Sequence, residues 1–191
     1  MKLTEPVVVA SQNPDKIAEI EAVLADLGVV IERGHTWPDV EETEDTLAGN
    51  ALLKARAVVA ATGMAAIGDD TGLEVDALGG APGVYTARYA GPNATYEDNV
   101  TKLLTELADC SERRARFRTA VALVTPAGGE VVVEGVLDGV ITTERRGDCG
   151  FGYDPVFEVG GRTLSEMGST EKHKISHRGL ALRALHDALE E

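Results

Sequence analysis

Two stretches of this sequence place cationic side chains where an α-helix is expected to begin. In the first, Asn13 is a suitable N-cap and Lys16 falls in the first helical turn. In the second, Ser176 is a suitable N-cap and is followed by His177 and Arg178. A helix N-terminus carries positive potential and free N–H groups, so cations gathered there indicate a bound anion, usually phosphate. Taken alone, either start is better explained by a cation solvated or paired at the surface, but the two together favour a phosphate site.

Paired carboxylates form the second chemical feature. Asp69 and Asp70 follow a run of small residues and precede Gly72. Carboxylate oxygens suit Mg²⁺, which often takes one or two of them together with waters and phosphate oxygens, and a further carboxylate could activate water. The alternative is an Asp-rich turn in which Asp70 caps backbone N–H groups. Glu41 and Glu42, taken by themselves in so acidic a chain, are more often solvated.

The segment Gly150–Pro155, G-F-G-Y-D-P, combines two glycines with two aromatic residues. Glycines let a backbone approach a ligand closely, and Phe151 or Tyr153 could stack on a nucleobase. The alternative is a turn whose aromatic rings join the core. The standard nucleotide and metalloprotease motifs G-x-x-x-x-G-K-[ST], G-x-G-x-x-G and H-E-x-x-H do not occur, so a nucleotide would be bound by other means.

The composition narrows the class of function. Lys and Arg number 18 against 32 Asp and Glu, and the resulting net charge of −14 argues against nucleic-acid binding through a basic surface. An anionic substrate would therefore need locally concentrated cations. No apolar run approaches the roughly 18 residues of a membrane span, and the N-terminus lacks a signal-peptide core. Cys110 and Cys149 form neither a disulfide framework nor a metal-spaced pair, so we expect a cytoplasmic protein without a membrane partner.

The elements that must position these residues alternate between strand and helix patterns, which predicts an α/β fold with a mixed sheet in a single domain over residues 1–191. Pro14 suits the first position of the first helix. The expected elements are a strand at 7–10, a helix at 14–27, a strand at 29–31, a helix at 47–62, a small-residue strand running into a turn at 69–72, a helix at 96–108, a hairpin with its turn at 126–129 and a last helix after Ser176.

In their order along the chain, these segments resemble the inosine triphosphate pyrophosphatase family, also called the dITP/XTP pyrophosphatases. The matching motifs are S-x-N-x-x-K at 11–16, E-E-T at 41–43, N-A-x-x-K-A at 50–55, D-D-T-G-L at 69–73, A-L-G-G-x-P-G-x-x-T-A-R at 77–88, G-F-G-Y-D-P at 150–155 and S-H-R-G at 176–179. They cover nearly the whole chain, so chance does not explain them.

The resemblance implies an enzyme that hydrolyses a nucleoside triphosphate to the monophosphate and pyrophosphate with Mg²⁺. Its substrates would be the deaminated purine nucleotides ITP, dITP and XTP, removed in this way from the nucleotide pool. The implied fold is an elongated mixed β-sheet flanked by helices in two lobes, with the active-site cleft between them, and the implied assembly is a homodimer.

The resemblance also implies roles for particular residues. Glu41 and Asp70 would hold the metal, and Asp70 would also accept the proton of the attacking water. The triphosphate would be bound by Ser11, Gln12, Asn13, Pro14, Asp15 and Lys16. Thr71 and Lys172 would contact the substrate, His177 and Arg178 would contact its base or phosphates, and the base pocket would be lined by Phe151, Gly152, Tyr153 and Asp154.

The chain departs from the family pattern at one position near this site. Relatives often have F-x-E-N where this sequence has Leu47-Ala48-Gly49-Asn50, so Gly49 removes an acid that could support the metal or the water.

Selection for the base has a physical basis, because a hydrogen-bond donor facing the purine 6-position favours the carbonyl of inosine and xanthine over the amino group of adenine. Cys149 is interpreted as a small filler and not as a nucleophile.

Three other functions compete with this assignment. The first is a Maf-like pyrophosphatase that acts on modified pyrimidine triphosphates, against which the S-H-R-G and G-F-G-Y-D-P segments argue. The second is a nucleotide-binding module that has lost turnover, against which the presence of Lys16, Glu41 and Asp70 argues. The third is a structural or interaction protein, which would leave the two cationic helix starts unexplained.

Overall fold

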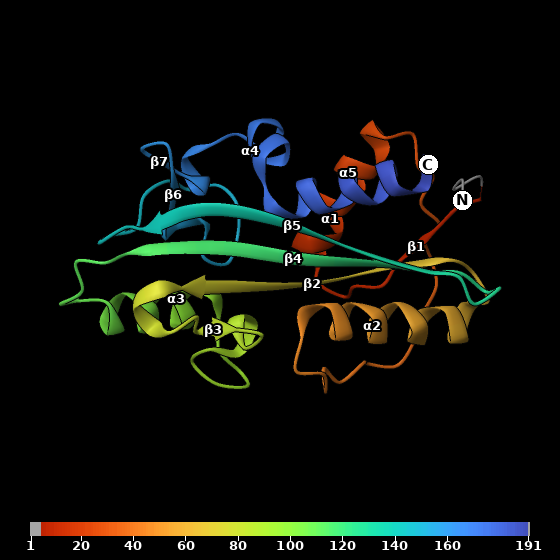
Figure 1. The fold of residues 1–191 in the computed structure, drawn as a ribbon, viewed down its shortest axis with the longest axis horizontal. Coiled ribbons are helices and arrows are strands. Elements are labelled where there is room, and N and C mark those ends of the chain that lie inside the picture. Colours follow the sequence, from red (N-terminus) through yellow and green to blue (C-terminus); the bar gives the residue numbers. More distant parts are fainter. Residues whose placement is uncertain (1–4, 191) are drawn as a thin grey trace. The chain divides into compact units, whose positions relative to one another are not determined.

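A computed structural model describes residues 5–190 and shows a sheet flanked by helices (Figure 1). The helices are α1 (Pro14–Asp26), α2 (Leu47–Thr62), α3 (Tyr96–Glu106), α4 (Ser169–Ile175) and α5 (His177–Glu190). The strands are β1 (Val8–Val9), β2 (Ala66–Val75), β3 (Pro82–Gly83), β4 (Arg114–Val124), β5 (Glu130–Ile141), β6 (Phe157–Val159) and β7 (Arg162–Thr163). No helix of the described part of the chain has the length and apolar character needed to cross a membrane.

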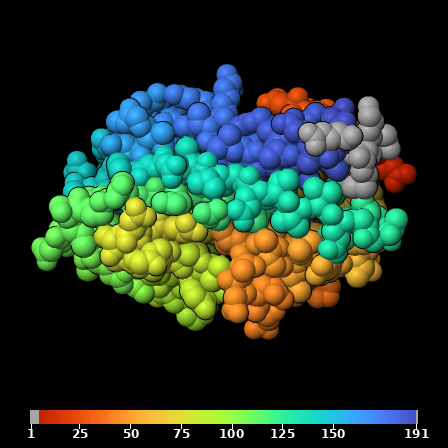
Figure 2. Space-filling view, viewed as in Figure 1, coloured from red at the N-terminus to blue at the C-terminus, as the bar shows by residue number. Residues whose placement is uncertain are grey.

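The strands form one sheet of seven in the order β1-β2-β4-β5-β6-β7, with β3 beside β2. β1 runs parallel to β2, with Val8 opposite Ala66, whereas β3 is antiparallel to β2 and β6 is antiparallel to β5. The predicted α/β class with a mixed sheet is therefore confirmed. Figure 2 shows side chains of β5 at the molecular surface, where Val132 and Val136 are exposed.

The described residues divide into two compact units, through both of which β2, β4 and β5 run. The first unit comprises residues 5–70, 119–136 and 176–190, and the second comprises 71–118 and 137–175. The single domain predicted over residues 1–191 remains a prediction.

The first unit has helices on both faces of its sheet (Figure 1). Successive strand residues point to opposite faces, so Val9 packs in a cluster with α1 and α5, and its neighbour Val8 packs in a cluster with Val58 of α2. Gly68 on β2 lets α2 approach closely, since a Cβ there would lie 2.3 Å from the carbonyl oxygen of Ala51. This close packing brings one face of α2 to the two aspartates that follow Gly68.

The second unit has its own apolar core. Leu73 of β2, Leu103 of α3 and Phe157 of β6 are fully buried in it, and the Phe117 and Phe157 ring centroids lie 4.6 Å apart. α3 begins with a capping box, in which the Thr95 side chain and the side chain at the third helical position each bond the other's backbone. These contacts fix the frame that carries the segment 150–155.

Three sequence expectations need correction. Asp69–Gly72 do not form a turn but lie inside the ten-residue strand β2, because close packing on α2 and ion pairs of the aspartates outweigh the local turn preference. The strand expected at 29–31 is reduced to one parallel bridge between Val7 and Ile31. The last helix is preceded by a further short helix, α4, which the sequence analysis did not predict. The hairpin turn is confirmed by the hydrogen bond from Thr125 N to Gly129 O.

Candidate active site

Asp70 lies on β2 and is held by two residues of α2. Lys54 Nζ lies 3.1 Å from its Oδ1, and Asn50 Nδ2 lies 3.2 Å from its Oδ2. Residues four apart lie on the same face of a helix, so the motif N-A-x-x-K-A presents both side chains to one carboxylate. Asp70 is only 5% exposed, and both of its oxygens are therefore fixed by the protein.

A second carboxylate reaches the same ammonium group. Glu42 Oε1 accepts a hydrogen bond of 2.9 Å from Lys54 Nζ. The acidic segment that carries Glu42 is tied to α2, because Glu44 N donates to Asn50 Oδ1 at 3.0 Å and Asn50 Nδ2 lies 3.3 Å from Glu44 O. Asn50 therefore links the acidic segment to Asp70.

The charges of this cluster act on one another. Burial raises the pKa of Asp70, and Glu42 adds to the rise while Lys54 opposes it. For Lys54 burial acts to lower the pKa, but the attraction of Asp70, Asp69 and Glu42 outweighs it and raises the pKa above the ordinary value. Lys54 is therefore a permanent cation that keeps two neighbouring carboxylates together.

The donor set of this cluster fits a divalent cation. Asp70 and Glu42 both reach the Lys54 ammonium, so two carboxylates lie near one another. Mg²⁺ commonly takes one or two carboxylates while waters and phosphate oxygens fill its other positions. Within residues 5–190 no group of three or more His, Cys, Asp or Glu side chains forms a metal site, so substrate oxygens would have to complete the coordination. Glu41 is exposed, and no hydrogen bond or ion pair between described residues joins it to Asp70; its role as a ligand remains a prediction.

The start of α1 has the predicted cap. Asn13 Oδ1 accepts from Asp15 N at 2.9 Å and from Lys16 N at 3.4 Å, and Pro14 occupies the first helical position. Ser11 Oγ in turn accepts from Asn13 N at 3.2 Å, which stiffens the preceding loop. The cap orients this helix start, whose dipole suits an anion.

Lys16 belongs to a buried ion-pair network. Its Nζ lies 3.4 Å from Asp69 Oδ2, and Arg178 Nε lies 3.1 Å from the same oxygen. Arg178 also donates to Glu19, a residue of α1 that is 3% exposed. The two cationic helix starts of the sequence analysis thus meet at one aspartate.

This network shifts the titration of its members. Burial acts to raise the pKa of Asp69, but Lys16, Arg178 and Lys54 outweigh it and hold that pKa well below its usual range. Burial lowers the pKa of Lys16, and the nearby Lys54 and Arg178 lower it further against the attraction of Asp69. Arg178 is 1% exposed, and its guanidinium group donates hydrogen bonds to Asp69 and Glu19. Arg178 therefore helps to hold Asp69, the carboxylate that pairs with Lys16.

His177, at the start of α5, is oriented by a residue of β4. Its Nδ1 lies 2.6 Å from the hydroxyl oxygen of Thr119, and both side chains are buried. Ser176 caps the helix as predicted, since its Oγ accepts from Gly179 N at 3.0 Å. Gly135 of β5 allows close packing here, because a Cβ would lie 2.1 Å from the His177 carbonyl oxygen.

In the second unit, two of the predicted base-pocket residues, Phe151 and Asp154, come together with Lys172, which was predicted to contact the substrate. Lys172 Nζ lies 2.7 Å from Asp154 Oδ2 and 4.7 Å from the centroid of the Phe151 ring. The same Asp154 oxygen accepts from Phe151 N at 2.8 Å. Gly150 has a φ of +80°, and a Cβ there would lie 2.1 Å from Asp154 Oδ2, so this close turn requires glycine. The cluster offers an aromatic face, a carboxylate and an ammonium group within a few ångströms.

Other predicted residues of the second unit have different surroundings. Tyr153 is buried, and its hydroxyl donates to the Thr86 carbonyl oxygen at 2.9 Å, so it is held as a core residue. Burial raises the pKa of Tyr153 above its ordinary value, which keeps the hydroxyl a donor. Gly152 has a φ of +63°, and Thr71 is a half-buried residue of β2.

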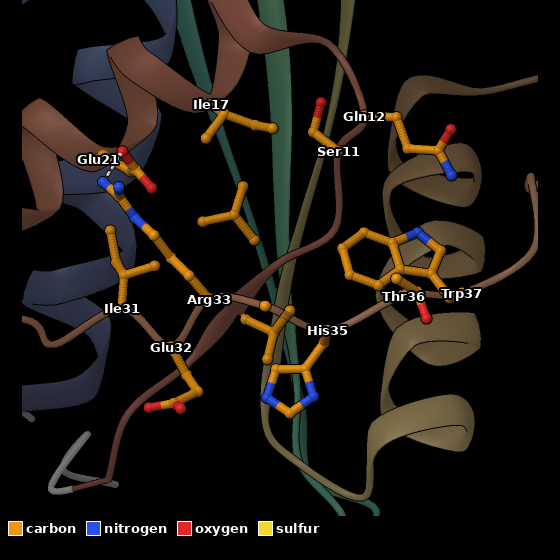
Figure 3. A pocket seen from close by; sticks show the side chains of 13 residues that line it. Ser11, Gln12, Ile17, Glu21, Ile31, Glu32, Arg33, His35, Thr36 and Trp37 are labelled. Atoms are coloured by element: carbon orange, nitrogen blue, oxygen red, sulfur yellow. Dashed lines mark hydrogen bonds and ion pairs between the residues drawn. The ribbon is translucent and has the colours of Figure 1, made fainter.

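A hollow of about 450 Å³ adjoins the predicted triphosphate segment in the first unit (Figure 3). Ser11 and Gln12 form part of its wall, and Trp37 and His35 form another part. Gln12 therefore lies beside this hollow, whereas the ion-pair network around Lys16 is formed with Asp69 and Arg178.

Comparison with known proteins identifies the family. A model of the Ham1 family matches residues 7–188. This chain belongs to the Ham1 family. The dITP/XTP pyrophosphatase of Chlorobaculum tepidum is 48% identical over 202 residues, which cover 93% of this chain and 89% of that protein. The protein of the same name from Bacillus licheniformis is 45% identical, and the alignment covers 97% of this chain and 98% of the relative.

Solved structures of Ham1 proteins share the fold. A HAM1 protein from Coxiella burnetii superimposes with a TM-score of 0.86 at 42% identity, covering 97% of this chain and 98% of that one. A nucleoside-triphosphatase / dITP/XTP pyrophosphatase from Mycobacterium abscessus gives a TM-score of 0.73 at 44% identity over 95% of this chain and 97% of that one. The fold implied by the motifs is thus supported by independent structures.

Several Ham1 residues of the candidate site were missed by sequence analysis. Asn50 and Lys54 stood in a recognised motif, and their spacing of four could have placed them on one helix face. Glu42 was passed over in favour of its neighbour Glu41. Glu19 and Thr119 carry no local signal, because their partners Arg178 and His177 are distant in sequence and meet them only through packing.

Proposed function

We propose that this Ham1 protein hydrolyses the deaminated purine nucleoside triphosphates ITP, dITP and XTP to the monophosphate and pyrophosphate, and that it uses Mg²⁺ to do so. The observation that carries the proposal is that Asp70 and Glu42 both contact Lys54, while Asp69, the residue directly before Asp70, pairs with Lys16. The names of the relatives, dITP/XTP pyrophosphatase, support the substrate class.

In this proposal Asp70 accepts the proton of the attacking water. The reaction forms one bond from the water oxygen to phosphorus and breaks the anhydride bond between the α- and β-phosphates. Asn50 fixes one oxygen of the carboxylate, and Lys54 favours its ionised form, which is the form that accepts a proton. The second carboxylate, Glu42, is the neighbour that makes Asp70 more basic.

The phosphates are proposed to bind at the start of α1. The positive end of the α1 dipole favours an anion, and Lys16 supplies a cation next to it. Glu42 and Asp70, with Glu41 as the ligand that the family resemblance implies, would hold Mg²⁺, which when bound would neutralise phosphate charge and order the water. Arg178 and Asp69 keep Lys16 in place.

The base is proposed to be recognised by Phe151, Asp154 and Lys172. The ring of Phe151 offers a stacking face, and the ammonium of Lys172 offers a hydrogen-bond donor. A donor facing the purine 6-position pairs with the carbonyl of hypoxanthine or xanthine and leaves the amino group of adenine unpaired. The homodimer and the cytoplasmic location are likewise proposals that rest on the resemblance and composition.

Product analysis with an Asp70 variant tests the proposal. The wild-type protein with Mg²⁺ and ITP should release inosine monophosphate and pyrophosphate in equal amounts. Asp70→Asn should lower turnover by about 10²- to 10⁴-fold, the usual contribution of a general base, while ITP still binds in calorimetry. Asp187→Asn, an exposed position, serves as the matched control. Release of the diphosphate and phosphate, preference for dTTP, or full activity of Asp70→Asn would contradict the proposal.

A further inference from the structure

The hollow beside Ser11 and Gln12 has the character of a ligand site that the proposed reaction does not use (Figure 3). Its volume of about 450 Å³ lies in the range of small-molecule pockets. Ile17 of α1 and Ile31 contribute apolar walls, and the indole of Trp37 contributes an aromatic one. Such a mixture of apolar walls and few polar groups is typical of sites that take small organic ligands.

The hollow arises because a strand pairing ends early. Val7 donates to Val30 O at 3.0 Å and accepts from Glu32 N at 2.9 Å, but the chain then turns away from β1 at Gly34, whose φ is +86°. Val8 N donates to Ala65 O on the side of β2. Because successive N–H groups of a strand point to opposite edges, the N–H of Val9 points to the other edge of β1, where the pairing has ended at the bridge between Val7 and Ile31.

This open edge leaves a backbone donor at the hollow. Within residues 5–190, no residue accepts a hydrogen bond from Val9 N on that edge, although Val9 itself is only 6% exposed and lines the hollow. Buried peptide N–H groups are almost always paired, so a donor in this position favours a ligand with a carbonyl or ring-nitrogen acceptor.

The charges of the hollow exclude a phosphate as its ligand. Arg33 forms an ion pair with Glu21, as the dashed line in Figure 3 shows, and Glu32 adds a second carboxylate. The lining therefore has no excess of positive charge, in contrast to the helix start that carries Lys16. In Figure 3 the Trp37 indole lies to the right, with the Gln12 side chain above it, and the His35 ring lies lower in the view.

We propose that this hollow binds an uncharged planar heteroaromatic ring of nucleobase size that carries a carbonyl group. The ring stacks on Trp37, and its carbonyl accepts from Val9 N–H, with the Gln12 amide as a further polar partner. Because Ser11 and Gln12 belong both to this wall and to the loop before α1, an occupant reaches the segment proposed to bind the triphosphate. The inference does not rest on the proposed hydrolysis, and the two share only Ser11 and Gln12, which the family resemblance assigns to the triphosphate.

Trp37 makes the site directly observable, because it is the only tryptophan of the chain. Its indole N–H gives a single signal in a ¹H–¹⁵N spectrum of the full-length protein. Hypoxanthine, added without metal or triphosphate, should shift this signal with saturation. Inorganic phosphate should leave it unchanged.

Two matched substitutions locate the binding. Ile31→Phe fills part of the hollow and should weaken hypoxanthine binding by about tenfold or more, since the added ring clashes with the ligand. Val30→Phe adds the same ring at the neighbouring position, which is 62% exposed, and should bind like the wild type. Thr36→Phe, at an exposed lining position, repeats the test if Ile31→Phe does not fold.

The proposal is overturned by any of three results: a Trp37 signal that hypoxanthine does not shift, a shift that rises without saturation, or saturable binding that both filling variants retain. Because the measurement needs no turnover, its failure leaves the proposed hydrolysis untouched. Conversely, a protein without pyrophosphatase activity could still bind hypoxanthine here.

Discussion

Lys54 and Asp70 face one another with 3.1 Å between the ammonium nitrogen and the nearer carboxylate oxygen. The contact joins α2 to β2, and Gly68 makes it possible by letting the two elements pack closely. Burial and the neighbouring Glu42 raise the pKa of Asp70, whereas Lys54 lowers it. The proton affinity of the proposed general base is therefore set by two residues of opposite charge.

Substitution of these two residues should shift the Asp70 titration in opposite directions. In the metal-free protein, Lys54→Met removes the stabilising cation and should raise the pKa of Asp70, whereas Glu42→Gln removes a repelling charge and should lower it. Carboxyl ¹³C signals followed through a pH titration measure both shifts, and Lys174→Met at an exposed position is the control. Shifts in the same direction would refute this assignment.

The same signs carry over to activity. A carboxylate accepts a proton only when ionised, so turnover should fall as the pH drops through the pKa of Asp70. The acidic limb of the pH profile should therefore move to higher pH in Lys54→Met, the direction in which the Asp70 pKa moves when the cation is removed.

Removal of the Asp69 charge should destabilise the protein. Asp69→Asn leaves Arg178 and Lys16 buried without their shared carboxylate, and breaking such a pair costs about 3–5 kcal/mol. Urea unfolding at pH 7 measures the loss. Asp138→Asn, whose side chain is 83% exposed, should change the free energy of unfolding by less than about 0.5 kcal/mol.

The pH dependence of this effect follows from the depressed pKa of Asp69. A carboxyl with a lowered folded-state pKa contributes stability above its unfolded pKa of about 3.9, and this contribution is lost as the pH falls through the folded-state value. The difference between wild type and Asp69→Asn should be constant near neutral pH and shrink below about pH 4. A difference that grows on acidification would disprove the ion-pair explanation.

Thr119 is expected to act through His177. Thr119→Val keeps the shape but removes the hydroxyl 2.6 Å from Nδ1, and a hydrogen bond of this kind is worth about 0.5–1.5 kcal/mol. The ¹⁵N signals of the His177 ring should change in Thr119→Val and return toward the wild type in Thr119→Ser. An unchanged ring signal in Thr119→Val would show that the hydroxyl does not hold the imidazole.

Gly49 is expected to resist substitution even though it lies in a helix. Alanine would gain about 1 kcal/mol of helix propensity. A Cβ at this position, however, would lie 2.7 Å from the Glu44 Cβ, and overpacking costs about 1–3 kcal/mol. Gly49→Ala should therefore lower or leave unchanged the free energy of unfolding.

The steric explanation for Gly49 is tested by removing the side chain of Glu44, the residue that a Cβ at position 49 would contact. In a Glu44→Gly background the obstructing Cβ is absent, and Gly49→Ala should become stabilising. If Gly49→Ala stabilises the unaltered protein by the full propensity gain, the steric explanation for this departure from the family pattern is wrong.

Local sequence rules were sufficient for the caps of α1 and α5. Asn13 and Ser176 cap their helices as predicted, because a cap is decided by a side chain and the amides two or three residues away. The turn predicted at Asp69–Gly72 was wrong, since the propensities of aspartate and glycine are overridden there by packing on α2 and by Arg178.

The partners of the site residues lay beyond such rules. Arg178 and Glu19 are 159 positions apart and meet because α5 packs on α1. The sequence therefore indicated a cationic helix start, but it did not show that the Arg178 guanidinium pairs with carboxylates inside the protein. Glu41 and Glu42 are adjacent, and only the position of Lys54 in space distinguishes them.

Initial rates of pyrophosphate release with Mg²⁺ for ITP, XTP, GTP, ATP and dTTP under matched conditions are the decisive measurement of the proposed hydrolysis. We expect kcat/KM for ITP and XTP to exceed that for GTP and ATP, and dTTP to be turned over least. Equal rates for all five, or a preference for ATP or dTTP, would contradict it.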